Sequence, residues 1–208
     1  MPSSRQHALN IELDVKHINP FQGHSDEFLK LNPQHTVPTL VEHNVTLWDS
    51  HAIMVYLATN SKNSTLYPEN PIIRAKIHQY LHFDSGILFA RMRFAIDTVF
   101  HQGAPEIPKD RIENIYKAYD LFEATLVHSG TKYLVLDTNA TIADISVFSS
   151  VKAMVQMFPV TKEKYPKILE WLDLMKKENF YHEVKEDDCD DASKIFFQKM
   201  KNSNFGKK

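Results

Sequence analysis

Short apolar runs separated by polar clusters mark residues 31–57, and this pattern predicts strand, turn, strand and helix in that order. Pro38 heads the first apolar run, and it belongs at the start of a strand because proline has no N–H to donate to a ladder. A second apolar run covers residues 45–47, and the polar residues 42–44 turn between the runs, which predicts a hairpin. Asp49 and Ser50 then stand where a helix begins, ahead of a run of apolar residues at 52–57.

From residue 72 onward the apolar positions recur at helical spacing. One long helix is expected from Ile73 to Met92, and a second from Ile112 to Leu126, after a break rich in glycine and proline at residues 103–108. The sequence Thr141-Ile142-Ala143-Asp144 resembles a capping box, with aspartate in place of glutamate, and predicts the start of a third helix. A fourth is expected after Pro166, a residue type favoured in the first turn of helices.

These patterns divide the chain into two parts. The strand-like segments all lie before about residue 67. The polar residues 60–65, closed by Pro68 and Pro71, have the character of a linker. We therefore expect a small α/β domain over residues 1–66 and an all-helical domain over residues 72–208. A chain of 208 residues is long enough for two modest domains, each with its own core.

Composition narrows the class of protein. The chain is 43% hydrophobic and 24% charged, as in globular domains, and its net charge of -2 gives no broad reason to expect nucleic acid or anionic membrane as a partner. No apolar run approaches the ~20 residues of a membrane span, and the amino terminus lacks the apolar core of a signal peptide. The single cysteine, Cys189, excludes an internal disulfide and lies among carboxylates that disfavour its thiolate. These features predict a cytoplasmic protein.

The clearest candidate chemistry lies at the predicted helix start. An aspartate suits a ligand ammonium group, while a serine hydroxyl and the free N–H groups of a helix start suit a carboxylate. Asp49 and Ser50 are thus each chemically suited to a charged group of a ligand. The alternative is that Ser50 only caps the helix and Pro38 only interrupts a strand.

The stretches NPQHTVPTL and DSHAIMVYL, together with Thr141-x-x-Asp144, resemble the cytosolic glutathione transferases, and residues 81–94 resemble a substrate-facing helix of the insect epsilon class. The resemblance covers nearly the whole chain from about Ala8 onward. It implies a thioredoxin-like α/β N-terminal domain followed by an all-α C-terminal domain, the glutathione transferase fold. Of the two insect classes, epsilon and delta, the chain is more similar to epsilon.

The resemblance also implies a glutathione site. The Val37-Pro38 bond would be cis and would aim the Val37 backbone at the cysteinyl part of glutathione. Asp49 and Ser50 would hold the γ-glutamyl end. His35, two residues before Val37 and on the same face of an extended chain, would meet the glycine carboxylate, with His24 as a further candidate. A surface position is the alternative for both histidines.

Other side chains offer candidates for the second substrate and for metal binding. The resemblance implies that several residues of one helix surround an apolar electrophile, although each is equally consistent with ordinary core: Phe89, Met92, Arg93, Phe94, Ile96 and Phe100. His78 and His82 are four residues apart, a spacing that can bind a metal, but no third ligand accompanies them in the sequence, which favours a solvated helix face. We predict no metal site.

His51 is expected to pack, or to contact a partner subunit, rather than to bind substrate.

The start of the chain departs from the family pattern. Related enzymes begin with an apolar strand that ends in a catalytic serine, whose hydroxyl favours the glutathione thiolate. When Arg5 is matched to the family's arginine, the serine position falls on Met1 and the first strand is missing. The catalytic residue is therefore unknown, with Ser3 and Ser4 as candidates and a frayed terminus as their alternative.

The resemblance implies conjugation of glutathione to apolar electrophiles, a detoxification reaction that includes insecticide metabolism. It requires no cofactor, since glutathione is a co-substrate, and it implies a homodimer. Two other interpretations remain open from the sequence: a non-catalytic glutathione-binding or ligand-binding homologue that has lost its serine, and a truncated product that folds poorly.

Overall fold

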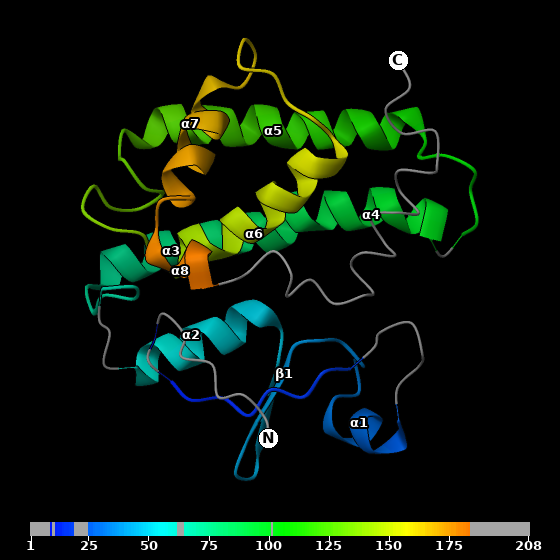
Figure 1. Cartoon of the computed structure of the whole chain (residues 1–208), viewed down its shortest axis with the longest axis vertical. Helices are drawn as coiled ribbons and strands as arrows, with labels where there is room; N and C mark the ends of the chain where they lie inside the picture. The colour runs from blue at the N-terminus through cyan, green and yellow to red at the C-terminus, as the bar shows by residue number, and fades with distance from the viewer. Residues whose placement is uncertain (1–8, 10, 19–24, 62–64, 101, 184–208) are drawn as a thin grey trace.

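The structure is a computed structural model, and it describes residues 9, 11–18, 25–61, 65–100 and 102–183. The helices after residue 70 lie in a bundle above a smaller part, which holds a hairpin and the first two helices (Figure 1). Ser3, Ser4, His24 and Cys189 lie outside the described residues, so the predictions about them are not addressed by this structure.

The smaller part begins with the short helix α1, Asp26–Leu31, whose first turn is capped by the Ser25 hydroxyl accepting from the Phe28 N–H at 3.2 Å. Strands β1, Thr39–Glu42, and β2, Val45–Trp48, form an antiparallel hairpin in which Thr39 pairs with Trp48. The predicted hairpin is confirmed, with the turn at residues 43–44. It is the only sheet in the described part of the chain, where residues 11–18 have no regular strand.

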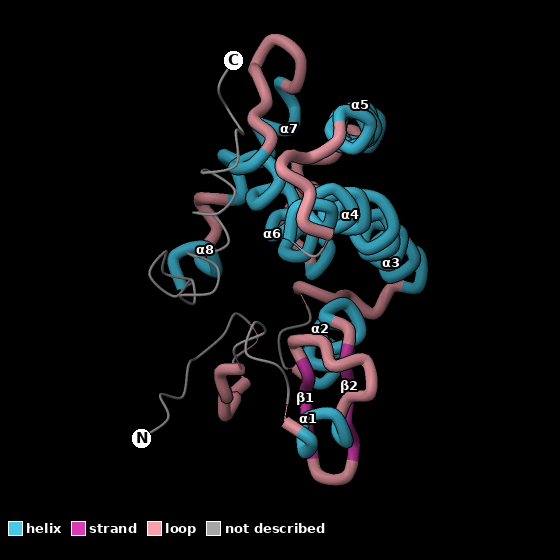
Figure 2. The backbone as a smooth tube through the Cα atoms, turned by 90° about the vertical axis from the view of Figure 1, so that its right-hand side faces the viewer, coloured by secondary structure: helices cyan, strands magenta, loops and turns pink. Residues whose placement is uncertain are grey.

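Helix α2, Ser50–Asn60, follows the hairpin directly and packs against both strands. Figure 2 shows it between the hairpin and the helical bundle, where its other side meets α6, Ile142–Met157. Two hydrogen bonds to carbonyl groups just after α2 strengthen this contact, one from a backbone N–H and one from a side-chain amide. The Ile142 N–H donates to the Leu66 carbonyl at 3.0 Å, and the Asn139 amide donates to the Thr65 carbonyl at 2.9 Å.

The predicted long helix is present as one helical run with an irregular centre. It consists of α3, Pro71–Phe83, a π-helical turn η1, Asp84–Leu88, and α4, Phe89–Phe100. In the π turn the Phe89 N–H donates to the carbonyl of Asp84, five residues back. Such turns inside α-helices are often found at functional sites.

The remaining helices complete the bundle: α5, Lys109–Ser129, α7, Pro166–Met175, and the short α8, Asn179–Glu183. Helix α5 ends at Gly130, whose positive φ of 64° is readily adopted only by glycine. The Glu123 carboxylate of α5 accepts from the N–H groups of Lys167 and Ile168, both at 2.9 Å, and so fixes the start of α7.

The predicted capping box of α6 is confirmed, and it is more extensive than the sequence indicates. The fully buried Asp144 carboxylate accepts from the Thr141 N–H at 2.9 Å and from the Thr141 hydroxyl at 3.0 Å. It also accepts from the Leu134 N–H at 2.9 Å and from the Trp171 indole at 3.3 Å. One side chain therefore joins the start of α6, the preceding loop and α7.

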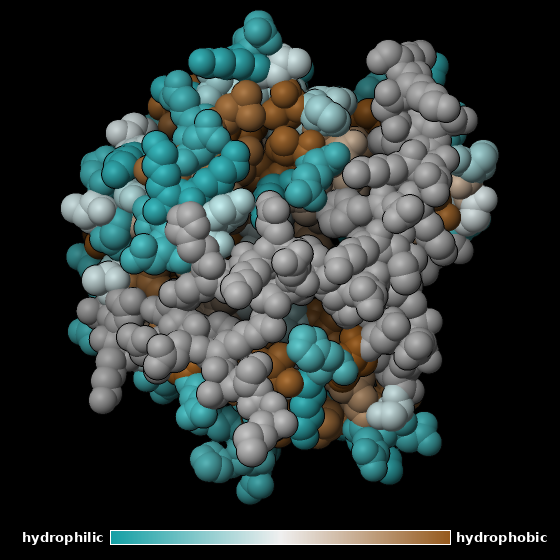
Figure 3. All heavy atoms as spheres, in the orientation of Figure 1, coloured by the Kyte–Doolittle hydropathy of each residue, from teal (hydrophilic) through white to brown (hydrophobic). Residues whose placement is uncertain are grey.

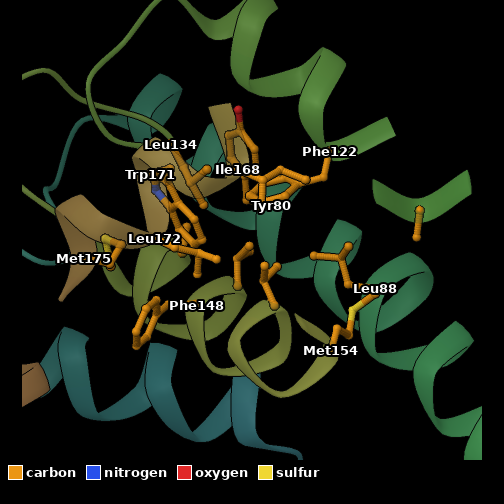
Figure 4. Close-up of a cluster of buried hydrophobic side chains, with 14 of the residues drawn as sticks. Tyr80, Leu88, Phe122, Leu134, Phe148, Met154, Ile168, Trp171, Leu172 and Met175 are labelled. Atoms are coloured by element: carbon orange, nitrogen blue, oxygen red, sulfur yellow. The ribbon is translucent and has the colours of Figure 1, made fainter. Parts of the chain in front are cut away.

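A continuous hydrophobic core fills the bundle. Figure 4 shows Phe122, Phe148 and Trp171 converging from α5, α6 and α7, and the Trp171 ring makes edge contacts with both phenylalanines. On the outside, hydrophilic side chains cover most of the described surface in Figure 3, with hydrophobic ones gathered over α5 beside α7. Within the described residues, no helix is long and apolar enough to cross a membrane.

Candidate functional site

The hairpin register brings the two candidate segments to one end of the sheet. Thr39 lies opposite Trp48, so Val37-Pro38 immediately before β1 and Asp49-Ser50 immediately after β2 are at the same end of the hairpin. The Val37-Pro38 bond is cis, as the resemblance implied, and Val37 is 48% exposed. The loop and the start of α2 therefore present a common surface.

The start of α2 is capped by Asp49 rather than by Ser50. The Asp49 Oδ1 atom accepts from the N–H groups of His51 and Ala52 at 3.0 and 3.1 Å, and its φ is 72°. Ser50 is the first residue of the helix and is half-buried. The alternative interpretation of the sequence, in which Ser50 serves only as the cap of this helix, is therefore wrong, because Asp49 is the cap. The Ser50 hydroxyl and N–H remain at a helix N-terminus, where anions are favoured.

His51 joins this end of the hairpin to the helical part. Its Nε2 lies 3.1 Å from Oδ2 of Asp84 in η1, an oxygen that also accepts from the Ser146 hydroxyl of α6. The hydrogen bond with Asp84 raises the pKa of His51, despite the opposing effect of burial, and the Asp49 carboxylate 3.6 Å from Nδ1 adds to the rise. The expectation that His51 packs rather than faces substrate agrees with this position.

Asp84 itself is the most deeply placed ionisable group near the site. It is 2% exposed, and its second carboxylate oxygen, Oδ1, has no hydrogen-bond partner in the described part of the chain. Because Ser146 donates to Asp84 and not to His51, the three side chains do not form the relay that activates a serine nucleophile. The cluster instead connects α2, η1 and α6.

His35 lies in the loop before the cis bond. It is exposed, its φ is 46°, and its N–H donates to the carbonyl of Asn32 at 2.8 Å. The positive φ shows that the backbone is not extended at His35, so the expectation that an extended chain puts His35 and Val37 on one face is wrong. That His35 meets the glycine carboxylate of glutathione stays a prediction. His24 is outside the described residues.

The residues expected to contact an electrophile follow one face of α4. Phe89, Arg93, Ile96 and Phe100 fall at positions i, i+4, i+7 and i+11, and Met92 borders them on the core side, where it is 6% exposed. Phe94 is roughly 140° around the helix from Phe89. The Arg111 guanidinium carbon lies 3.6 Å from the centre of the Phe94 ring, so Phe94 belongs to a contact with α5.

The two histidines with metal-like spacing are not joined by a third ligand in the described residues, where no cluster of three or more His, Cys, Asp or Glu side chains occurs. The His78 Nε2 lies 2.7 Å from the Tyr67 hydroxyl, while His82 is exposed. A cavity of about 430 Å³ lies elsewhere, between the end of α5 and α7, and contains none of the predicted site residues.

Sequence reasoning missed two side chains near the site, Asn32 and Asp84. Asn32 is fully buried and bonds across the loop that carries Val37, and an asparagine followed by proline is itself a turn signal. Asp84 falls on the buried face of the helical run, whose other buried residues there are apolar, and a buried carboxylate requires a partner. That partner, His51, is 33 residues away in sequence.

Two family models match the chain. Residues 7–60 match the N-terminal domain of glutathione S-transferases, and residues 98–180 match their C-terminal domain. Glutathione S-transferase 1 of Manduca sexta is 38% identical over 178 residues, which are 80% of this chain and 80% of that protein. The chain belongs to the glutathione S-transferase family.

Solved structures of this family agree with the fold and with the class. An epsilon-class glutathione S-transferase from the housefly, Musca domestica, has a TM-score of 0.84 and 35% identity, covering 95% of this chain and 89% of that one. A glutathione transferase homologue from Drosophila mojavensis, solved with bound glutathione, has a TM-score of 0.76 and 35% identity, covering 88% and 80%. The predicted glutathione transferase fold is therefore confirmed, and so is the similarity to the insect epsilon class.

Proposed function

We propose that this glutathione S-transferase homologue binds glutathione at the end of the hairpin and conjugates it to apolar electrophiles. The observation that carries this proposal is the hairpin register, which brings Val37-Pro38 and Asp49-Ser50 to one end of the sheet. The homologue from Drosophila mojavensis was solved with glutathione bound, which supports the choice of ligand.

Each part of glutathione has a chemically suitable partner in this arrangement. The Asp49 carboxylate, half-exposed beside the helix start, attracts the γ-glutamyl ammonium group. The Ser50 hydroxyl and N–H donate to the γ-glutamyl carboxylate at the positive end of α2. The backbone of Val37, an exposed residue, pairs with the cysteinyl backbone as another strand would, and His35 donates to the glycine carboxylate.

The reaction is attack of the glutathione thiolate on an electrophilic carbon, which forms a carbon–sulfur bond and expels the leaving group. It needs no metal or organic cofactor, because the nucleophile belongs to glutathione itself. We assign the α4 face of Phe89, Met92, Arg93, Ile96 and Phe100 to the apolar substrate. Methionine and aromatic side chains adapt to ligands of varied shape.

We further propose that the protein acts in the cytoplasm as a homodimer, as the family resemblance implies, and that it serves detoxification. Sedimentation of the full chain tests the oligomeric state, and a mass close to twice 24.1 kDa is expected. A single 24.1 kDa species across the concentration range would contradict the dimer.

Calorimetric titration with glutathione, followed by conjugation of a chromogenic aryl halide, tests the function in two steps. Saturable binding with turnover is the expected result. Saturable binding without turnover would support a non-catalytic glutathione-binding homologue. Absence of binding by the folded protein would remove glutathione from this site.

A further inference from the structure

The Asn32 side chain is the buried centre of the loop that joins α1 to β1. Asn32 is 0% exposed, although Pro33, Gln34, His35, Val37 and Pro38 around it are all exposed. A fully buried amide in a surface loop loses its bonds to water, and it is stable only when the protein replaces them.

The protein replaces those bonds with contacts on both sides of the cis bond. Asn32 Nδ2 donates to the Thr36 carbonyl at 2.9 Å and lies 3.2 Å from the Thr36 hydroxyl. The same nitrogen lies 3.0 Å from the Thr39 hydroxyl. Thr36 precedes Val37-Pro38 and Thr39 follows it, so one amide group holds both ends of the segment that presents Val37.

Two oxygen atoms of Asn32 hold the part of the loop that precedes Thr36. Its Oδ1 accepts from the Gln34 N–H at 2.9 Å, and its backbone carbonyl accepts from the His35 N–H at 2.8 Å. The backbone bond holds His35 at a φ of 46°, a region that residues other than glycine seldom adopt, and the side-chain bond holds Gln34 directly before it. Only an amide of this length supplies two donor hydrogens and an acceptor from one short side chain.

We propose that Asn32 is a positioning residue of the glutathione site, which sets the Val37 backbone and the His35 side chain in the geometry that glutathione requires. This inference rests on the proposed function. A loop that is already held in its binding geometry loses little conformational freedom when the ligand arrives, and this favours affinity. Asn32 is buried beneath the loop and acts through Val37 and His35, so we assign it no contact with the ligand.

Three substitutions separate the parts of this network. Asn32→Ala removes all the side-chain bonds. Asn32→Asp keeps the acceptor for the Gln34 N–H but places a carboxylate, which cannot donate, against the Thr36 carbonyl. Thr39→Val keeps the shape of Thr39 and removes one hydroxyl, which also donates to the Thr36 carbonyl at 2.9 Å.

We expect both Asn32 variants to weaken glutathione binding by about tenfold or more in calorimetric titration, and Thr39→Val by about threefold. KM for glutathione should rise in parallel, while kcat at saturating glutathione changes little, since the filled site restores the loop. Asp144→Ala is the control for loss of stability, because it breaks a buried network in the helical part and should leave glutathione affinity unchanged. If the Asn32 variants do not fold, Thr39→Val carries the test alone.

A double-mutant cycle distinguishes positioning from general damage. Asn32→Ala and His35→Ala should be non-additive, because the first substitution removes the side-chain bonds to Gln34 and Thr36 on either side of His35, although the backbone bond to His35 stays. Asn32→Ala and Ser50→Ala should be nearly additive, because they affect opposite ends of the ligand. Parent-like affinity in the Asn32 variants, or equal coupling with His35 and Ser50, would overturn the inference. Failure of the parent protein to bind glutathione would overturn the proposed function instead.

Discussion

Among the described residues up to 61, only Phe28, Asn32, Ile53 and Ala58 are buried. In contrast, α6 and α7 contribute buried hydrophobic side chains at almost every turn, and α5 does so over its central turns. The glutathione S-transferase homologue thus holds its two halves by different means. The helical half is fixed by a continuous core, and the loop and helix start of the hairpin half are fixed by short hydrogen-bonded networks. Substitutions in the helical half should therefore lower the free energy of unfolding, whereas substitutions in the hairpin half should lower the affinity for the ligand.

The largest effect is expected from the buried carboxylate of the helical half. Asp144→Ala removes the acceptor for two N–H groups, a hydroxyl and an indole, and leaves them buried. We expect a loss of about 3 kcal/mol in the free energy of unfolding, more than an exposed cap would cost. Chemical denaturation measures it, with the exposed Asp173→Ala as the matched control. An unchanged midpoint would mean that the motif does not hold the fold.

The next effect concerns ligand affinity in the hairpin half. Ser50→Ala should weaken glutathione binding by roughly 1–3 kcal/mol, because the γ-glutamyl carboxylate loses a charge-assisted hydrogen bond. The unfolding free energy should change little, since Asp49 and not Ser50 caps α2. Calorimetric titration and denaturation of the same variant check both statements. Equal glutathione affinity in the parent and the variant would remove Ser50 from the site.

A smaller effect is expected at the proposed electrophile face of α4. Ile96→Ala should raise KM for an apolar aryl halide by about threefold to tenfold, roughly 1 kcal/mol, and leave the affinity for glutathione unchanged. Phe94→Ala is the control, since its ring lies under the Arg111 guanidinium and away from that face. Steady-state kinetics with each substrate varied in turn measure both variants. A larger effect of Phe94 would place the pocket on the other side of the helix.

The smallest effect concerns the connection between the halves and its pH dependence. Because the folded state raises the pKa of His51, chiefly through Asp84, the charged His51 stabilises the fold fully below its unfolded pKa of about 6.5. That contribution disappears as the pH rises through the raised value in the folded state. We expect about 1 kcal/mol or less, since the pair is partly reached by solvent.

His51→Gln isolates this contribution. As the pH rises from below to above about 6.5, the parent should lose unfolding free energy relative to the variant, because only the parent carries the titrating imidazole with a raised pKa. Denaturation midpoints of both proteins across this range provide the measurement. Parallel pH profiles would contradict a stabilising His51–Asp84 pair.

Much of the architecture could be predicted from the sequence because it rests on local patterns. Pro38 and Asp49 mark the hairpin and the helix start, and Thr141 with Asp144 marks the cap of α6. The family resemblance added the cis bond and the assignment of glutathione. The contact of His51 with Asp84 could not be predicted from local patterns, because it depends on how α2 packs against the helical run of α3, η1 and α4. The π turn, and the burial of Asn32 under its loop, are likewise set by packing and not by periodicity.

The most direct test of the account is amide hydrogen exchange of the full chain with and without saturating glutathione. The ligand is proposed to bind at one end of the hairpin, so added protection should concentrate at residues 35–37 and 49–51. The core amides of α5 and α6 should change only by the uniform amount that ligand binding gives to global stability. Protection confined to the helical half, with residues 35–37 and 49–51 unchanged, would contradict a glutathione site built by the hairpin.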